Sequence, residues 1–353
     1  MKSQQKKPIE IDPAERQRRH RYLIATLVTC LTLAMLFGTA HVVKLGSNRM
    51  EDMRSKASYD LKDEHKHIRA AGEDIQAHRV HEEQSNASNT YELAEVQNMI
   101  TAEKWLEIEI MVLIPAGETV IGTNSERADI QDQPQHMVNL PGYYIDKYPV
   151  TNVQYAKFVA TTNHRPPLDW ELGKIPDKKN LHPVVMVSWY DAQAYCEHAG
   201  KRLPTEIEWE KAARGKDGKR WPWGDTMLPT NLNTYYNVGS TTLVTRYTQG
   251  QSSYGVFDMA GNVSEWTASD FIPYAGSSAP ATLFKPKMMT ESTNPLDRAM
   301  KVADLKTVEG VIYKVRRGGS WKSDPFASSA YHRNFSMPHY ASDFFGFRCA
   351  KDS

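Results

Sequence analysis

The sequence is poor in cysteine, with only Cys30, Cys196 and Cys349 among its 353 residues. Cys30 lies in an apolar run, which leaves Cys196 and Cys349 as the only possible pair within a globular domain. No CxxCH string occurs, so covalent haem attachment to this chain is excluded and no haem is expected. A large excess of either charge is also lacking, since the formal net charge is +1. Because proteins that bind nucleic acid usually carry a basic excess, we expect no nucleic-acid partner.

One long apolar run interrupts the otherwise polar N-terminal part. Residues 22–43 contain no Asp, Glu, Lys or Arg, and a helix of this length crosses a bilayer core of about 30 Å at about 1.5 Å per residue. Lys and Arg residues crowd the preceding tail, 1–21, which predicts a cytoplasmic N-terminus and an opposite, periplasmic location for the rest. We therefore expect a single-pass protein of a bacterial inner membrane. The alternative is a cleaved signal peptide with its small-residue site at Gly38-Thr39-Ala40.

Two further regions follow the apolar run. Residues 44–109 are polar, contain no proline and few aromatic residues, and are predicted to form a helical stalk. From residue 110 to 353, short apolar or alternating runs are separated by Gly, Pro and Asn, which is typical of many short strands and long loops. Two helices are expected there, at 150–162 with Thr151 as N-cap and at 190–200. The polar stretch 271–310 reads as a surface insertion.

The string GKRLPTEIEWEKAARG predicts a third helix within this domain. Thr205 and Glu208 have the spacing of a capping box, and Pro204 stops any helix before it. Trp209, Ala212 and Ala213 are then expected to face inward. The charged residues Arg202, Glu206 and Arg214 are interpreted as members of a buried ion network.

Several strings in the same order resemble the formylglycine-generating enzymes, the sulfatase-modifying-factor domain family. They are MVLIPAGETVIG, YPVTNVQYAKF, PVVMVSWYDAQAYCEHAGKRLPTEIEWEKAARG, WPWGD, YGVFDMAGNVSEWT, RRGGSW and GFRCA, and they span residues 111–350. The resemblance implies an α+β, C-type-lectin-like domain with little regular secondary structure. It also implies a groove suited to extended peptide segments.

The resemblance places the two copper-binding catalytic thiols of the family on Pro325 and Ala330. Neither residue is a thiol, and copper(I) requires soft sulfur ligands. We therefore expect no copper, no formylglycine generation and no catalytic residues, as in a pseudoenzyme. Other chemistry near His332 and His339 is an alternative, because relatives include iron-dependent sulfoxide synthases.

The resemblance also implies sites that stabilise the fold. The string GNVSEW corresponds to a calcium site with Asn262, Val263 and Glu265 as ligands, and hard cations prefer such oxygen donors. A second calcium site would use Asn231 and Asn237, the latter in place of the family's aspartate. Cys196 and Cys349 match positions that form a disulfide in some members, the alternative being two buried free thiols.

An anchor, a stalk and a domain without its catalytic thiols together suggest a binding role. We predict a non-catalytic, membrane-anchored extracytoplasmic scaffold or binding subunit of an envelope membrane complex, in the setting of a respiratory or other redox complex. Its partners would be the membrane and other membrane-complex proteins. The alternative is an accessory maturation factor, or an oxidase of different chemistry on the same fold, acting on a periplasmic protein.

Overall fold

The computed structural model describes residues 91–291, 303–307 and 310–353. Within those residues, none of the helices combines the length and the apolar character that a membrane crossing requires. The predicted membrane helix, 22–43, lies outside them, and so does most of the predicted stalk.

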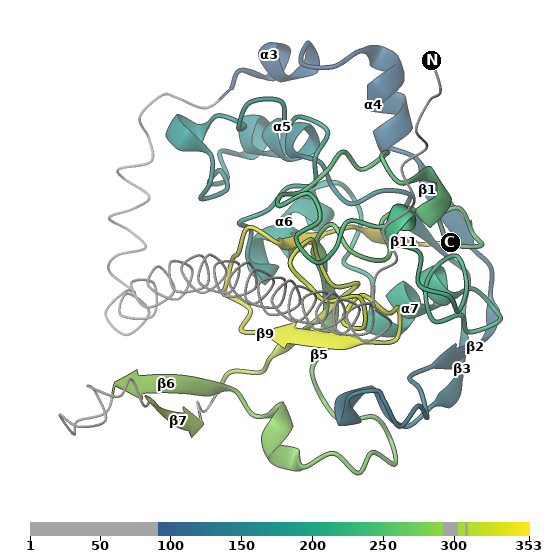
Figure 1. The fold of residues 1–353 in the computed structure, drawn as a ribbon. Helices are drawn as coiled ribbons and strands as arrows, with labels where there is room; N and C mark the ends of the chain where they lie inside the picture. Colours follow the sequence, from purple (N-terminus) through teal and green to yellow (C-terminus); the bar gives the residue numbers. More distant parts are fainter. Residues whose placement is uncertain (1–90, 292–302, 308–309) are drawn as a thin grey trace, which may run out of the picture. The chain divides into compact units, whose positions relative to one another are not determined.

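The structure is a mixed α/β domain built from short elements (Figure 1). Its helices are α3 (Leu93–Gln97), α4 (Ala102–Ile108), α5 (Asn152–Thr162), α6 (Trp189–His198) and α7 (Glu206–Arg214). Single 3-10 turns lie between them: η1 (Ile130–Asp132), η2 (Glu171–Gly173), η3 (Pro229–Asn231), η4 (Thr248–Gly250) and η5 (Ala281–Phe284).

Two small sheets and two hairpins account for the described strands. A three-stranded sheet has the order β1–β4–β11, from β1 (Met111–Ile114), β4 (Tyr143–Asp146) and β11 (Ala350–Asp352). A four-stranded sheet has the order β10–β5–β8–β9, from β10 (Phe345–Phe347), β5 (Ser264–Asp270), β8 (Lys314–Arg317) and β9 (Arg333–Ser336). Strands β2 (Gly117–Ile121) and β3 (His136–Leu140) form one hairpin, and β6 (Lys287–Glu291) and β7 (Ala303–Thr307) form the other. The second hairpin lies in the stretch predicted as an insertion.

The three predicted helices are present, and two of them have the predicted caps. Thr151 caps α5, and the Thr205–Glu208 pair forms a capping box at α7. Helix α6 begins one residue earlier than predicted, at Trp189, because Ser188 is the N-cap and Asp191 is the acidic partner in its capping box. As expected, Trp209, Ala212 and Ala213 are fully buried.

The domain begins before residue 110. Helix α3 packs against α5, and Val96 and Ile108 are buried in the same apolar cluster as Tyr155 and Phe347 (Figure 1). Residues 91–109 were predicted to belong to the stalk, but one face of this amphipathic segment, which includes Trp105, packs against the domain, while Leu93 and Leu106 stay exposed. A short amphipathic helix needs such a surface, because alone it is marginal in water.

Candidate active site

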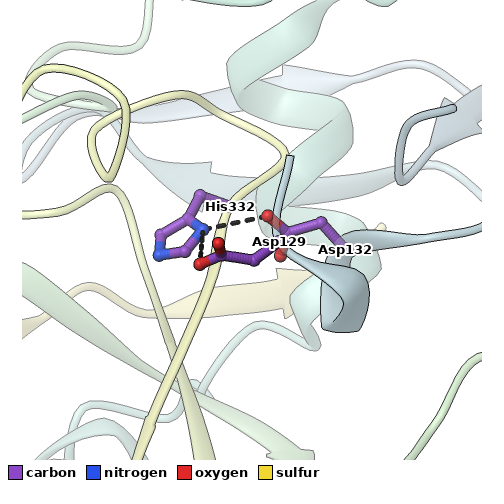
Figure 2. A group of neighbouring side chains, drawn as sticks. All are labelled: Asp129, Asp132 and His332. Atoms are coloured by element: carbon purple, nitrogen blue, oxygen red, sulfur yellow. Dashed lines mark hydrogen bonds and ion pairs between the residues drawn. The ribbon is translucent and has the colours of Figure 1, made fainter. Parts of the chain in front are cut away.

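Two loops that are distant in sequence bring Asp129, Asp132 and His332 together (Figure 2). Asp129 is the N-cap of η1, Asp132 is its last residue, and His332 immediately precedes β9. The Nδ1 atom of His332 lies 2.9 Å from an oxygen of Asp132 and 3.8 Å from an oxygen of Asp129. The three candidate ligand atoms all lie within 4.8 Å of one another. Asp132 is fully buried, whereas the Asp129 side chain is 64% exposed, so the cluster opens to solvent on one side.

The position of Asp132 is fixed by backbone contacts. Its second carboxylate oxygen accepts the backbone N–H of Arg333 at 2.8 Å, and its carbonyl accepts the N–H of Thr123 at 3.0 Å. Gly122, with φ +69°, permits this approach, since a Cβ there would lie 2.8 Å from the Asp132 carbonyl oxygen. The loop therefore depends on glycine at position 122.

The Arg333 side chain connects the two loops of the cluster to α7. Its guanidinium donates to both carboxylate oxygens of Glu206, at 2.8 and 2.7 Å, and to the carbonyl of Gln131 at 3.1 Å. The same group lies 4.0 Å from the centre of the Tyr274 ring. Because Arg333 is buried, loss of the Glu206 charge would leave an uncompensated cation in the interior.

A second buried pair positions the chain just before His332. Arg317 bonds to Glu210 and donates to the carbonyl oxygens of Ala330 and Tyr331, at 3.0 and 2.9 Å. Burial alone would lower the pKa of Arg317, but the Glu210 charge raises that pKa above its ordinary value. Arg214 completes the group with a 2.7 Å bond to Glu210. Glu206 and Arg214 thus belong to a buried ion network as predicted, with Glu210, Arg317 and Arg333 as members that the sequence did not indicate. The third predicted member, Arg202, is partly exposed and pairs instead with Glu208 and Asp352.

The three side chains of the cluster are arranged so that they could bind one cation together. Figure 2 shows one ring nitrogen of His332 directed at both aspartates and the other on the far side of the ring. A proton between His332 and Asp132 would need only one carboxylate. The second carboxylate adds negative charge, which a divalent cation would offset better than a proton.

The predicted thiol positions lie beside this cluster. The carbonyl of Pro325 accepts the indole N–H of Trp221 at 3.3 Å, and the buried Ala330 donates its N–H to the carbonyl of Arg220 at 2.8 Å. Both positions therefore contact the same Arg220–Trp221 segment. Ala330 precedes His332 by two residues.

The side chains predicted to bind calcium have protein partners. Asn262 accepts the N–H of Thr242 at 2.9 Å and donates to Asp258 at 2.8 Å. Glu265 accepts two bonds from Arg348, at 2.6 and 2.7 Å, and one from the indole N–H of Trp209 at 2.7 Å. Calcium at Asn262, Val263 and Glu265 stays a prediction, and it would have to compete with Arg348 for the carboxylate.

The two residues of the second predicted calcium site, Asn231 and Asn237, lie in different environments. Asn231 is buried and donates to the carbonyl of Gln249 at 3.0 Å, whereas Asn237 is exposed. Within the part of the chain that the structure describes, no hydrogen bond joins the two side chains. This site also stays a prediction.

The two domain cysteines form a disulfide, Cys196–Cys349, with a Cα–Cα distance of 5.6 Å. The bridge joins α6 to the residue before β11, and it confirms the pairing that the resemblance implied. No free thiol remains among the described residues, so the domain itself offers no cysteine for copper(I).

His332 and His339 do not act as a pair. His332 bonds to Asp132, whereas the His339 ring lies edge-on to Tyr340 at 4.8 Å. Asp343, also near the predicted thiol positions, pairs with Lys322 at 2.7 Å. Asp129 and Asp132 were not predicted, because 200 residues separate Asp132 from His332 and no local pattern connects them.

A separate pocket of about 350 Å³ lies at the C-terminal half of α7. Its lining includes Lys211, Ser253 and Tyr254, and burial lowers the pKa of Lys211. The Lys211 ammonium donates to the carbonyls of Pro115 and Gly117, at 2.8 and 2.9 Å. These bonds give Lys211 a structural role, so the pocket is the weaker candidate.

Comparison with known proteins agrees with this fold. The model of the sulfatase-modifying factor enzyme 1-like domain family matches residues 96–353. The chain belongs to this family. Among solved structures, PvdO from Pseudomonas aeruginosa has a TM-score of 0.52 at 24% identity, over 69% of this chain and 94% of that one. Treponema denticola variable protein 1 has a TM-score of 0.51 at 21% identity, over 69% and 95%. These two likenesses show the fold alone.

Curated relatives carry the names of enzymes. The chain is 34% identical over 258 residues to serine/threonine-protein kinase Pkn1 of Chlamydia trachomatis, covering 69% of this chain and 38% of that protein. It is 30% identical over 276 residues to hercynine oxygenase of Mycolicibacterium smegmatis, covering 68% and 61%. It is 27% identical over 318 residues to the formylglycine-generating enzyme of Mus musculus, covering 73% and 79%. The chain thus spans less than two thirds of the length of hercynine oxygenase and well under half of that of Pkn1.

These relatives contradict the prediction of a non-catalytic scaffold or binding subunit, and the prediction that the chain is not an enzyme. The prediction treated the residues Pro325 and Ala330 as the loss of all catalysis. Family members named for different reactions share this domain, so the missing thiols argue against one reaction and leave others open.

Proposed function

We propose that this chain is an oxidative enzyme that holds a redox-active divalent cation between Asp129, Asp132 and His332. The observation that carries the proposal is the convergence of one imidazole and two carboxylates within 4.8 Å, beside Ala330. Iron(II) and manganese(II) accept such mixed nitrogen and oxygen ligands, whereas copper(I) prefers sulfur. The relative named hercynine oxygenase supports an oxidative reaction.

The residues present fit a cation of this kind. One carboxylate oxygen of Asp132 is held by the backbone N–H of Arg333, so the other oxygen faces His332. His332 is positioned in turn, because Arg317 holds the carbonyl oxygens of the two residues before it. Asp129 lies at the exposed rim, where it would complete the ligand set while leaving further coordination positions for a substrate or dioxygen. The cation would supply the redox chemistry, and these loops would supply its position.

Metal binding tests the proposal directly. Full-length protein is stripped with a chelator, loaded anaerobically with iron(II) or manganese(II), and analysed for bound metal after gel filtration. We expect about one equivalent in the wild type and a loss of at least tenfold in affinity in Asp129→Asn and His332→Gln, because each removes one of three ligands. Asp129 is exposed, so its variant should fold normally. His339→Gln is the matched control, since this histidine lies outside the cluster.

Two results would refute the metal assignment. One is wild-type protein that binds neither ion above the level of Asp129→Asn. The other is metal binding that survives both ligand substitutions but is lost in the His339 control. Oxygen uptake by loaded wild-type protein, absent from Asp129→Asn, would support the oxidative class.

The disulfide supports an oxidising compartment as the place of action. Bonds such as Cys196–Cys349 persist outside the cytoplasm and are rare within it. A periplasmic location, as expected from the N-terminal sequence, is therefore part of the proposal. Alkylation of intact cells with a membrane-permeant thiol reagent should leave Cys196 and Cys349 unlabelled unless a reductant is added first.

A further inference from the structure

One arginine of the domain differs from the other arginines around the cluster in having no acidic partner. Arg214, Arg317 and Arg333 are buried, and each pairs with a glutamate. Arg220 is partly exposed, and no ion pair or hydrogen bond of its guanidinium is found among the described residues. Its Nε atom is buried without any hydrogen-bond partner. The nearby carboxylate of Asp225 accepts the backbone N–H of Arg220, at 2.8 Å, and does not pair with the side chain.

Aromatic rings surround the guanidinium instead. Its central carbon lies 4.6 Å from the ring centre of Trp221, 5.0 Å from that of Phe326 and 5.9 Å from that of Tyr331. Ring faces attract the cation but do not neutralise its charge or satisfy its N–H donors. The group is therefore fixed in orientation and still able to bind an anion.

This arginine lies at the candidate active site. The carbonyl of Arg220 accepts the N–H of Ala330, and its side chain contacts Tyr331, the neighbour of His332. Phe326 is 59% exposed and so offers an apolar surface next to the cation. A ligand that contacts both would combine a negative charge with an apolar body.

We propose that Arg220, with Phe326 beside it, recognises a carboxylate on the substrate of this enzyme. The planar guanidinium fork matches a carboxylate in two parallel hydrogen bonds. A single cation among rings suits a monoanion on an apolar body better than a doubly charged phosphate, which needs more donors. This inference rests on the proposed function, since only an enzyme has a substrate. The substrate class that it predicts is molecules or peptide segments that carry a carboxylate.

Binding of small probes separates this site from the metal site. Benzoate and its neutral analogue benzamide are titrated into full-length protein by isothermal titration calorimetry and ligand-observed NMR, with and without loaded metal. We expect benzoate to bind with a dissociation constant on the order of 1 mM, and benzamide at least tenfold more weakly. Arg220→Gln should weaken benzoate at least tenfold. Arg220→Lys keeps the charge but loses the planar fork, so its affinity for benzoate should lie between those of the wild type and Arg220→Gln. Phe326→Ala should weaken benzoate binding less than Arg220→Gln does.

Arg246→Gln is the control, because Arg246 is an exposed arginine that also lies over a ring, at 5.6 Å from the centre of Tyr247. It should bind benzoate as the wild type does. Equal binding of benzoate and benzamide, or an unchanged affinity in Arg220→Gln, would overturn the proposal. Inorganic phosphate that displaces benzoate more strongly than acetate does would overturn the carboxylate class.

These experiments distinguish a failure of the metal-site proposal from a failure of the carboxylate-site proposal. Benzoate binding to metal-free protein, lost in Arg220→Gln, would uphold the carboxylate site even where no metal binds. Normal metal binding with no benzoate site would refute this inference alone. If Arg220→Gln does not fold, Arg220→Lys and Phe326→Ala provide the same comparison.

Discussion

Asp258 carries a carboxyl group that is enclosed in the domain, next to the Asn262 amide that donates to it at 2.8 Å. Burial raises the pKa of Asp258 from 3.8 to about 7, against the opposing effects of the Asn262 bond and the Arg348 charge. The cause is desolvation, which disfavours the charged form. The folded protein therefore keeps this proton at pH values where the unfolded chain has lost it.

The sign of the pH dependence follows from proton linkage. Between pH 3.8 and about 7 the unfolded state binds fewer protons at this site than the folded state, so this group makes stability fall as the pH rises. The slope is at most about 1.4 kcal/mol per pH unit. Asp258→Asn removes the titration and keeps the shape, and asparagine tolerates the positive φ of 53° at this position.

We therefore expect Asp258→Asn to gain stability relative to the wild type as the pH rises from 5 to 8. Urea unfolding at pH 5, 6.5 and 8 measures the difference. Asp177→Asn is the control, since that side chain is 87% exposed and should give no pH-dependent difference. A constant difference between Asp258→Asn and the wild type at all three pH values would mean that Asp258 does not titrate in this range.

Helix α7 links the fold to the candidate site, because one short element supplies both acidic partners of the buried arginines. Glu206 holds Arg333, and Glu210 holds Arg317, so the loops around His332 depend on where α7 begins. The start is set by Thr205, whose hydroxyl accepts the N–H of Glu208 at 3.3 Å, while Glu208 accepts the N–H of Thr205 at 2.7 Å. A capping box of this kind satisfies two donors that a helix leaves unpaired.

Thr205→Ala should lower the free energy of unfolding by about 1 kcal/mol, because it removes one side of the capping box. Chemical denaturation monitored by circular dichroism gives the value. Thr282→Ala, at an exposed position in η5, should change stability by less than about 0.5 kcal/mol. A Thr205 variant as stable as the Thr282 variant would show that packing alone fixes the start of α7.

At the element scale, sequence reasoning succeeded where the signals are local. The caps Thr151 and Thr205 lie within three residues of their partners, so they could be recognised from spacing. The partner of Glu206 in α7 could not be recognised in this way, because Arg333 lies 127 residues away. The same holds for the candidate site, where 200 residues separate Asp132 from His332. Residues 91–109 were assigned to a stalk because their amphipathic pattern does not say which surface covers the apolar face.

At the scale of the whole molecule, the C-terminal residues close the domain on itself. Strand β11 pairs with β4, and the backbone of Ala350 exchanges two hydrogen bonds with Arg202, at 2.7 and 2.8 Å. The Cys196–Cys349 bridge adds a covalent link at the same place, across a sequence separation of 153 residues. A link across so long a segment restricts the unfolded chain more than a short one does.

Removal of the bridge should therefore lower the free energy of unfolding by about 4–5 kcal/mol in the chain-entropy view of disulfides. The comparison uses full-length wild type and the double variant Cys196→Ala/Cys349→Ala, each unfolded by urea with and without dithiothreitol. Reductant should destabilise the wild type toward the double variant and leave the double variant unchanged, because Cys30 is then its only thiol. A wild type that is indifferent to complete reduction would mean that the strand pairing of β11 and the Arg202–Ala350 bonds close the domain without help from the bridge.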